Sequence, residues 1–385
     1  MIDRFQRKYA KELLAHFPCL GILGPRQIGK TTFAKQLMQG GRKKFLYLDL
    51  ESHEDIQKLE HAETFLREYE NVTVIIDEVQ RRKDLFPLLR SLIDRKRVPA
   101  RFILLGSASP ELIREASESL AGRIAYLELS GILFPEVEHK IKLNALWLHG
   151  GYPDPLLHPK ASYAWMNNYV KNYVERDLPL LGLSASPSLI RRLWSMLAHC
   201  HGQTLNYEQL SKSLEIDQKT VKRYIDFLED ALLVRRLQSY TANISKRLVK
   251  APKIYLRDSG ILHYFLNIEN TLSLKSHPVL GSSWEGFVIE HLSQLKSERV
   301  ELNFYRSHNG AEMDVVFVKS GKACAAAEIK FGDKITPSRG NFEACETLNV
   351  KQRFLIRQEG DDFESVNGFK VVSFKSFITK YLPKI

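Results

Sequence analysis

The chain has 385 residues, a length that favours two or three domains and excludes a single small module. Hydrophobic residues make up 44% and charged residues 26% of the chain, so most of it is expected to fold around apolar cores. Lys and Arg number 56 against 45 Asp and Glu, and the formal net charge of +11 favours a polyanionic partner such as nucleic acid.

The cysteines and the first residues indicate the compartment. The four cysteines are far apart and form no C-x-x-C pair, which argues against a disulfide framework or a zinc site. Residues 1–8 are polar, and no run in the chain approaches the ~20 apolar residues of a membrane span. We therefore expect a cytoplasmic protein that does not enter a membrane. The cysteines are Cys19, Cys200, Cys324 and Cys345.

Five short apolar runs alternate with helix-like stretches in the first third of the chain. This alternation is typical of a parallel sheet flanked by helices, and it predicts an α/β domain over residues 1–132. Residues 31–38 and 84–93 are expected to be helices, and Ser109–Pro110 is expected to begin another. The predicted strands are 19–23, 45–50, 72–76, 102–105 and 124–129.

The middle of the chain is predicted to be mainly helical. Residues 133–185 lack strand alternation and are interpreted as a helical lid or connector. Three short helices and a strand over 232–237 predict a winged helix-turn-helix over residues 186–250, with Asn206 and Asp217 as helix caps. The first of these helices is expected to bury one face, formed by Leu189, Leu193, Met196 and Cys200.

A phosphate-binding loop follows the first predicted strand. It matches the pattern G-x-x-x-x-G-K-[ST] and opens a helix, where backbone N–H groups can surround a phosphate chain. Lys30 is expected to reach the β- and γ-phosphates, and Thr31 to bind Mg²⁺. The alternative is a glycine-rich turn without a ligand. The predicted nucleotide-binding residues are Gly24, Pro25, Arg26, Gln27, Ile28, Gly29, Lys30, Thr31 and Thr32.

Two acids end the third predicted strand. Asp77 can hold Mg²⁺ through its water shell, while Glu78 orients and deprotonates the attacking water. Such a pair alone would more often be an ordinary turn, but beside the phosphate loop it predicts a site for nucleotide hydrolysis. Ser107 ends the fourth strand, where it is interpreted either as a sensor of the γ-phosphate or as a helix cap.

These motifs together resemble the AAA+ class of P-loop ATPases, and more narrowly a prokaryotic family with a C-terminal domain of poorly defined function. The resemblance implies ATP as the nucleotide, the strand order 5-1-4-3-2, and an arginine supplied near the γ-phosphate in cis or from a neighbouring subunit. Arg123 and Arg176 are the two candidates. Besides the phosphate loop, the motifs are Ile76-Asp77-Glu78-Val79-Gln80, Leu105-Gly106-Ser107, Ser119-Leu120-Ala121-Gly122-Arg123, Gly150-Gly151-Tyr152-Pro153 and Glu175-Arg176-Asp177.

The third helix of the predicted winged helix presents basic residues away from its apolar face. Lys219, Lys222 and Arg223 are the candidate nucleic-acid contacts. The alternative is that this module is a lid or a docking piece of the ATPase. Further basic residues are expected to contact phosphates from the wing. They are Arg235, Arg236, Lys246, Arg247 and Lys250.

Acids gather on two predicted strands of the C-terminal domain, residues 251–385. Asp314 begins one strand, and Glu328 and Lys330 lie two residues apart at the end of the next, so they share a face. Glu285, on a helix that starts at Trp284, could add another carboxylate. Carboxylates can bind Mg²⁺ for phosphodiester cleavage, and the lysine can position the attacking water.

This arrangement resembles the PD-(D/E)xK nuclease superfamily, which implies that Glu285, Asp314 and Glu328 bind metal and that Lys330 assists. No proline precedes Asp314, and the alternative is a degenerate fold with a salt-bridged rim. The whole chain is thus interpreted as a Mg²⁺-dependent ATPase that acts on nucleic acid, chiefly DNA. The rival is a nucleotide-gated regulator that binds a protein or DNA without cleaving it. The sequence is compatible with a homo-oligomer.

Overall fold

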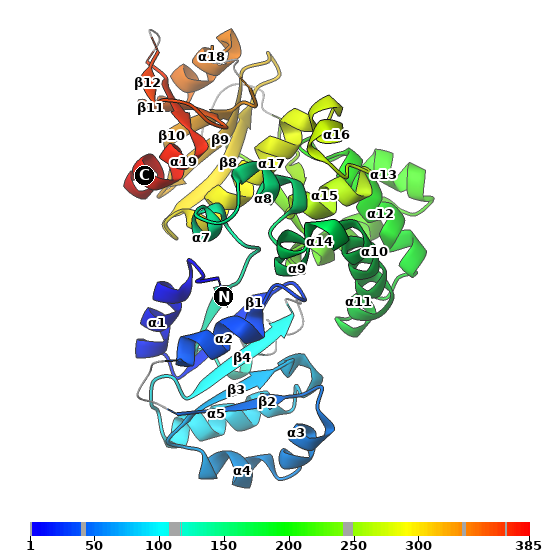
Figure 1. The fold of residues 1–385 in the computed structure, drawn as a ribbon, viewed down its shortest axis with the longest axis vertical. Helices are drawn as coiled ribbons and strands as arrows, with labels where there is room; N and C mark the ends of the chain where they lie inside the picture. The colour runs from blue at the N-terminus through cyan, green and yellow to red at the C-terminus, as the bar shows by residue number, and fades with distance from the viewer. Residues whose placement is uncertain are drawn as a thin grey trace.

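The computed structural model describes residues 2–39, 44–107, 116, 118–241, 249–332, 336–365 and 368–385. The N-terminal α/β unit lies at one end of the molecule, and the C-terminal sheet with its helices lies at the other (Figure 1). Three of the predicted features lie outside the described residues. These are the helix start at Ser109–Pro110 and the basic residues Lys246 and Arg247.

A five-stranded parallel sheet forms the N-terminal unit. Its order is β2-β3-β4-β1-β5, which is the expected order 5-1-4-3-2 read from the other edge, so that prediction is confirmed. All five predicted strands are present, with shifts of one or two residues at their ends. The strands are β1 (Cys19–Gly24), β2 (Phe45–Asp49), β3 (Thr73–Asp77), β4 (Phe102–Ser107) and β5 (Ile124–Glu128).

Helices cover both faces of this sheet (Figure 1). Alternate strand residues point to opposite faces, so Leu20 and Ile22 join one apolar core while Cys19 joins another. The first core includes side chains of α1 (Arg7–His16) and α2 (Lys30–Met38). The second core is covered mainly by helices on the other face. These are α4 (Ala62–Glu68) and α5 (Leu85–Arg95), whereas α3 (His53–Lys58) precedes them and buries none of its residues.

Residues 133–185 contain helices and turns but no strand, as predicted. A π-helical turn, η3 (Tyr173–Asp177), follows the longest helix of this stretch and ends beside the phosphate loop. Such turns are rare and are found frequently at functional sites. The helices are α7 (Phe134–Val137), α8 (Leu143–His149), α9 (Pro153–Leu157), α10 (Ser162–Asn172) and α11 (Leu178–Leu180).

Three helices follow, α12 (Pro187–His199), α13 (Tyr207–Leu214) and α14 (Gln218–Asp230). The predicted caps are confirmed, because the Asn206 side chain accepts a hydrogen bond from Gln209 N and the Asp217 side chain accepts one from Thr220 N.

The predicted buried face of α12 is confirmed fully only at Leu193, while its other members pack at the margin of the core. Leu189, Met196 and Cys200 are only half-buried, because the neighbouring helices and aromatic rings cover the side of α12 that carries Trp194. The residues that α12 buries are Ile190, Leu193, Trp194, Leu197 and Ala198.

An eight-stranded sheet joins the segments on both sides of residue 250. Strand β6 (Val234–Ser239) pairs antiparallel with β7 (Lys253–Leu256) and parallel with β8 (Val300–Arg306), so β6 and β7 form one edge of the C-terminal sheet. The sheet order is β12-β13-β11-β10-β9-β8-β6-β7. The other strands are β9 (Glu312–Lys319), β10 (Lys322–Ile329), β11 (Gln352–Arg357), β12 (Phe363–Glu364) and β13 (Lys370–Ser373).

The C-terminal helices pack against this sheet and against the helical region (Figure 1). Helix α17 is the longest helix described, and it begins four residues before the predicted start at Trp284. No helix in the described part of the chain has both the length and the apolar character needed to cross a bilayer. The helices are α15 (Ser259–Phe265), α16 (Thr271–Ser276), α17 (Leu280–Leu295), α18 (Arg339–Thr347) and α19 (Phe374–Ser376).

A largely buried ion network connects the N-terminal sheet to the C-terminal sheet and helix α17. Arg257, which follows β7, pairs with Glu128 at the end of β5 and with Glu290 of α17, where Nη2 and Oε1 are 2.6 Å apart. Arg235 of β6 pairs with the same Glu290, at 2.9 Å. Burial alone would raise the pKa of Glu290, but Arg235 and Arg257 lower it to about 2. The carboxylate is therefore held charged between the two guanidinium groups.

Three fully buried histidines lie between the helical region and the C-terminal domain. Burial lowers the pKa of His201 to about 3 and those of His263 and His291 to about 4. His291 accepts a hydrogen bond at Nε2 from the backbone N–H of Phe134, 3.0 Å away, and its Nδ1 lies 2.8 Å from Phe287 O. This pattern requires a neutral ring with its proton on Nδ1.

Acid should therefore destabilise the protein through these rings. The unfolded chain protonates its histidines below about pH 6.5, whereas the folded chain does so only near pH 4, so the free energy of unfolding falls as the pH drops across this window. In His291→Gln the amide oxygen can still accept from Phe134 but does not titrate. Urea unfolding at pH 7 and pH 5 should show a loss of stability smaller by about 1–2 kcal/mol than in the wild type. An equal loss in both proteins would contradict the assignment of a neutral His291.

Candidate functional site

The phosphate loop connects the end of β1 to the start of α2. Gln27 and Gly29 have positive φ angles, 62° and 95°, and Gly29 directly precedes the helix. Few residues other than glycine adopt this conformation, and a loop that alternates in this way turns successive N–H groups toward one point. The backbone is thus arranged to bind an anion at the N-terminus of α2.

Lys30 is buried at the base of this loop. Its Nζ donates hydrogen bonds to Gly24 O at 3.0 Å and Pro25 O at 2.9 Å. Burial lowers the pKa of Lys30, and the carboxylates of Glu78 and Asp77 partly oppose that shift. The ammonium group is therefore held on the loop and can exchange a carbonyl partner for a phosphate oxygen.

Asp77 lies directly opposite the loop at the end of β3. Its Oδ2 accepts hydrogen bonds from Thr31 Oγ1 at 2.5 Å and from Tyr47 OH at 2.9 Å. The structure thus brings together the hydroxyl and the carboxylate that were predicted to hold Mg²⁺, and both are oxygen donors of the kind that this cation prefers. Tyr47 was missed, because a lone tyrosine in a strand carries no motif.

Glu78 follows Asp77 with a left-handed backbone, φ 54°, and accepts a hydrogen bond from the amide of Gln80. Burial raises its pKa, and the nearby Asp77 adds to the shift while Lys30 opposes it. A carboxylate whose pKa is moved toward neutrality is suited to accept a proton from water.

A cavity of about 600 Å³ opens between the loop, Glu78 and helix α9. This size is typical of small-ligand pockets. The predicted residues Gln27 to Thr32 all line it, whereas Gly24, Pro25 and Arg26 do not. Pro153 and Leu157 of α9 form part of the wall, so the end of the Gly150-Gly151-Tyr152-Pro153 motif lies beside the phosphate loop.

Arg26 and Arg176 meet at the mouth of the loop on one acid. Asp177 Oδ1 lies 2.6 Å from Arg26 Nη1 and 3.1 Å from Arg176 Nε. Arg26 also pairs with Glu51 at 3.2 Å. Arg176 is well exposed, and the π-helical turn places it beside the loop of its own chain.

Arg123 lies at the other edge of the sheet. It directly precedes β5, so it is at the amino ends of the parallel strands, whereas the phosphate loop follows the carboxyl end of β1. Asp94 holds its guanidinium group with two hydrogen bonds, of 2.6 and 2.8 Å. Arg123 therefore cannot serve the nucleotide pocket of its own chain, and the role in cis proposed for it is corrected.

Ser107 is buried and pairs in register with Gly24, so it lies next to the start of the phosphate loop. The alternative role as a helix cap involves residues 108–115, which lie outside the described residues. Both interpretations of Ser107 stay predictions.

The basic residues of α14 are exposed as predicted. Lys219, Lys222 and Arg223 form no ion pair with any other described residue. The wing arginines differ, because Arg235 is bound to Glu290 and Arg236 to Glu229 and Asp226. These ion pairs argue against the expectation that the two arginines contact phosphates, which stays a prediction.

The structure brings the predicted C-terminal residues into one cluster. Asp314 Oδ2 accepts a hydrogen bond from Ile329 N at 2.9 Å, which places it beside Glu328. Lys330 Nζ lies 2.5 Å from Glu328 Oε1. Glu285 of α17 faces the same cluster from the helix side, where the Tyr255 hydroxyl donates to it at 2.5 Å.

A lysine that was not predicted lies among these acids. Lys253 of β7 places its Nζ 3.0 Å from Glu312, 3.1 Å from Glu285 and 3.5 Å from Asp314. Burial raises the pKa of Glu285 to about 7 and that of Glu328 to about 8, with Asp314 adding to both shifts. In the described part of the chain, no three His, Cys, Asp or Glu side chains are arranged to hold a metal ion.

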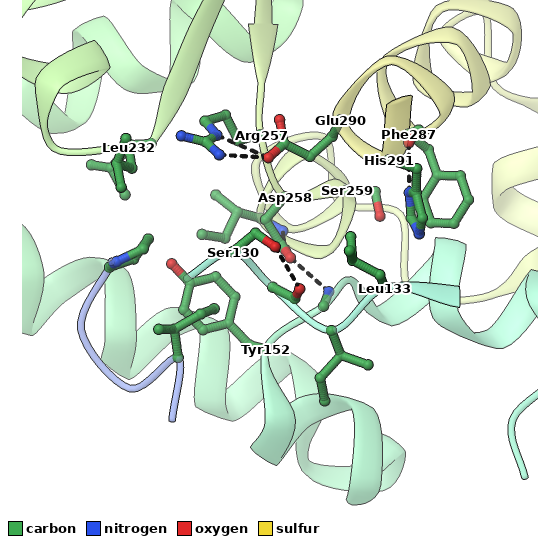
Figure 2. A pocket seen from close by; sticks show the side chains of 17 residues that line it. Ser130, Leu133, Tyr152, Leu232, Arg257, Asp258, Ser259, Phe287, Glu290 and His291 are labelled. Atoms are coloured by element: carbon green, nitrogen blue, oxygen red, sulfur yellow. Dashed lines mark hydrogen bonds and ion pairs between the residues drawn. The ribbon is translucent and has the colours of Figure 1, made fainter. Parts of the chain in front are cut away.

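A small cavity of about 50 Å³ lies between the phosphate loop, residues 130–133, the segment 257–259 and helix α17. Figure 2 shows Asp258 and Tyr152 facing this cavity. Asp258 accepts hydrogen bonds from Gly151 N at 2.7 Å and from Ile261 N at 2.9 Å. A Cβ on Gly150 would lie 2.3 Å from Asp258 Oδ1, so only glycine fits there. The Gly151–Asp258 hydrogen bond thus connects the segment before α9, which lines the cavity beside the phosphate loop, to the start of α15.

Three family models match this chain in succession. Residues 16–138 match an AAA domain, residues 140–272 a domain of unknown function (DUF8612), and residues 280–377 another domain of unknown function (DUF4143). The first match confirms the resemblance to AAA ATPases, while the winged helix and the nuclease-like domain stay predictions.

Two curated relatives align with most of the chain. The uncharacterized proteins Rv2008c of Mycobacterium tuberculosis and Mb2031c of Mycobacterium bovis are each 42% identical over 348 residues, covering 90% of this chain and 78% of the relative. The solved Walker-type ATPase PABY2304 of Pyrococcus abyssi is 16% identical, with a TM-score of 0.47, over 69% of this chain and 96% of that one. This chain belongs to the same family as the two mycobacterial proteins, and its N-terminal part is an AAA-type ATPase domain.

Proposed function

We propose that the protein binds ATP with Mg²⁺ and hydrolyses it. The observation that carries this proposal is the contact between Thr31 Oγ1 and Asp77, with Lys30 and Glu78 lining the same cavity. In this arrangement Lys30 and the loop N–H groups bind the phosphates, and Thr31 and Asp77 hold the cation. Glu78 takes the proton from the attacking water.

Substitution of Lys30 and of Glu78 should separate binding from chemistry. Lys30→Ala removes the cation that binds the phosphates, so both ATP affinity and turnover should fall, turnover by at least about 100-fold. Glu78→Gln keeps the size of the side chain but not the base, so ATP should still bind while turnover falls by at least about 100-fold. Phosphate release and equilibrium binding of a fluorescent ATP analogue measure the two effects.

Lys44→Ala is the matched control, because Lys44 is an exposed lysine beside β2 of the same sheet and does not line the cavity. Its activity should equal that of the wild type. Unchanged hydrolysis in Lys30→Ala would overturn the assignment of the site.

We further propose that Arg176, rather than Arg123, assists hydrolysis within one chain. Arg176→Ala should lower turnover by more than about tenfold without a matching loss of ATP affinity, because the positive charge is used chiefly as the γ-phosphate leaves. Arg123→Ala should leave the turnover of dilute monomers unchanged. Activity that depends on Arg123 and on protein concentration would instead point to an arginine supplied by a neighbouring subunit in a homo-oligomer.

Helix α14 is proposed as a contact for nucleic acid, and DNA is the partner to test first. The supporting observation is that Lys219, Lys222 and Arg223 are exposed and unpaired among the described residues, whereas the wing arginines are neutralised internally. An unpaired basic helix face attracts phosphates and releases their counterions on binding.

The double variant Lys222→Glu with Arg223→Glu should weaken DNA binding by at least about tenfold at low salt. The slope of log affinity against log salt concentration should become shallower by about two. Fluorescence anisotropy with a labelled duplex measures both quantities. Lys160→Glu with Lys171→Glu makes the same charge change at exposed lysines of the helical region and serves as the control. Equal affinities in the two double variants would assign α14 to another role, such as a lid.

For the C-terminal domain we favour binding without cleavage over cleavage. The observation behind this choice is the position of Lys253, whose ammonium group lies between carboxylates predicted to hold a metal. On this proposal ATP binding changes the contacts of helix α9, and the hydrogen bond between Gly151 and Asp258 carries the change to the C-terminal half.

A further inference from the structure

Lys253 is almost completely buried at the centre of the C-terminal acid cluster. The exposed fraction of its side chain is 4%, and three carboxylates from two elements, α17 and β9, surround its Nζ. An ammonium group has three N–H donors, so the three distances of 3.0 to 3.5 Å account for all of them. Burial alone lowers the pKa of Lys253, but Glu285, Asp314 and Glu312 outweigh burial and the net pKa is raised.

Lys253 uses the same oxygens that a divalent metal would need. Mg²⁺ binds oxygens at about 2.1 Å, so an ion shared by Glu285 and Asp314 would lie beside the ammonium group, with no water between the two positive charges. Tyr255 also donates to Glu285 Oε1, the oxygen that Lys253 contacts. The remaining acid, Glu328, is occupied by Lys330 and by the Asn341 amide at 2.9 Å. The residues present therefore do not fit a metal shared by these carboxylates.

We propose that Lys253 is the resident cation of the C-terminal acid cluster, in the place that a divalent metal takes in a nuclease, and that it ties strand β7 to α17 and β9. The ion pairs of the cluster then hold β7 against the rest of the C-terminal domain whether or not a ligand is bound. This inference rests on the part of the proposed function that assigns binding without cleavage to this domain, and it does not depend on ATP hydrolysis.

The test is Mn²⁺ binding by the full-length chain without nucleotide, measured by titration calorimetry. Wild type and Asp314→Asn should bind Mn²⁺ equally, because any ion held near the phosphate loop is common to both. Lys253→Met is similar in length and neutral, so it should gain an Mn²⁺ site that the wild type lacks. Adding Asp314→Asn to Lys253→Met should abolish the gain.

Lys253→Met leaves three acids without their cation, so it should unfold at a lower temperature in EDTA and recover with Mn²⁺. Lys253→Met with Glu312→Gln removes both partners of another pair, keeps Glu285 and Asp314, and should show the same Mn²⁺ gain if the single variant does not fold. Mn²⁺ binding by the wild type that Asp314→Asn abolishes would overturn the proposal. So would a folded Lys253→Met chain that gains no site.

Cleavage provides an independent readout of the same cluster. Wild-type protein incubated with DNA and Mn²⁺, with and without ATP, should produce no cuts that Asp314→Ala abolishes. Cuts that do depend on Asp314 would overturn the proposal even if Lys30→Ala showed the expected loss of ATP turnover. Failure of the ATPase assignment would leave the Mn²⁺ result unaffected, because those titrations contain no nucleotide.

Discussion

The parallel register of β1, β4 and β3 is the constraint on which the nucleotide site depends. Because all three strands run in the same direction, the loop after β1 and the acid at the end of β3 emerge at one edge of the sheet, where Thr31 and Asp77 make direct contact. Neither residue holds the other in place; the buried strands do. A reversal of β1 or β3 would carry one half of the site to the opposite edge of the sheet, the edge at which Arg123 lies.

The sequence was most informative where a function is encoded by neighbouring residues. The phosphate loop, the Asp77–Glu78 pair, the helix caps and the five strands of the first sheet all follow from local patterns, and all of them are present. Such features depend on backbone conformation and on residues a few positions apart. Their conformations are largely determined by interactions between neighbouring residues, which do not require the compact fold.

Residues that meet across long stretches of chain could not be predicted in this way. Lys253 and Tyr47 are single residues without a motif, and their partners lie far away in the sequence. Asp177 belongs to a short motif, but its contact with Arg26 also crosses a long stretch of chain. The count of basic residues was also misleading, because Arg235 and Arg236 are neutralised by acids inside the protein. The face of α12 was assigned from one helix alone, whereas the elements packed around Trp194 decide which side is buried. These outcomes are properties of the tertiary structure.

Strand β6 precedes residue 250, but it lies between β7 and β8, and both of these partners follow that residue. A chain cut at that position would leave β6 without either partner and would leave β7 and β8 without the strand between them, so each fragment would expose unpaired strand edges of the kind that aggregate. The two modules that the sequence suggests on either side of residue 250 thus share one β-sheet. A gene divided at this point would not encode two segments that each fold independently, so the two segments form one folding unit.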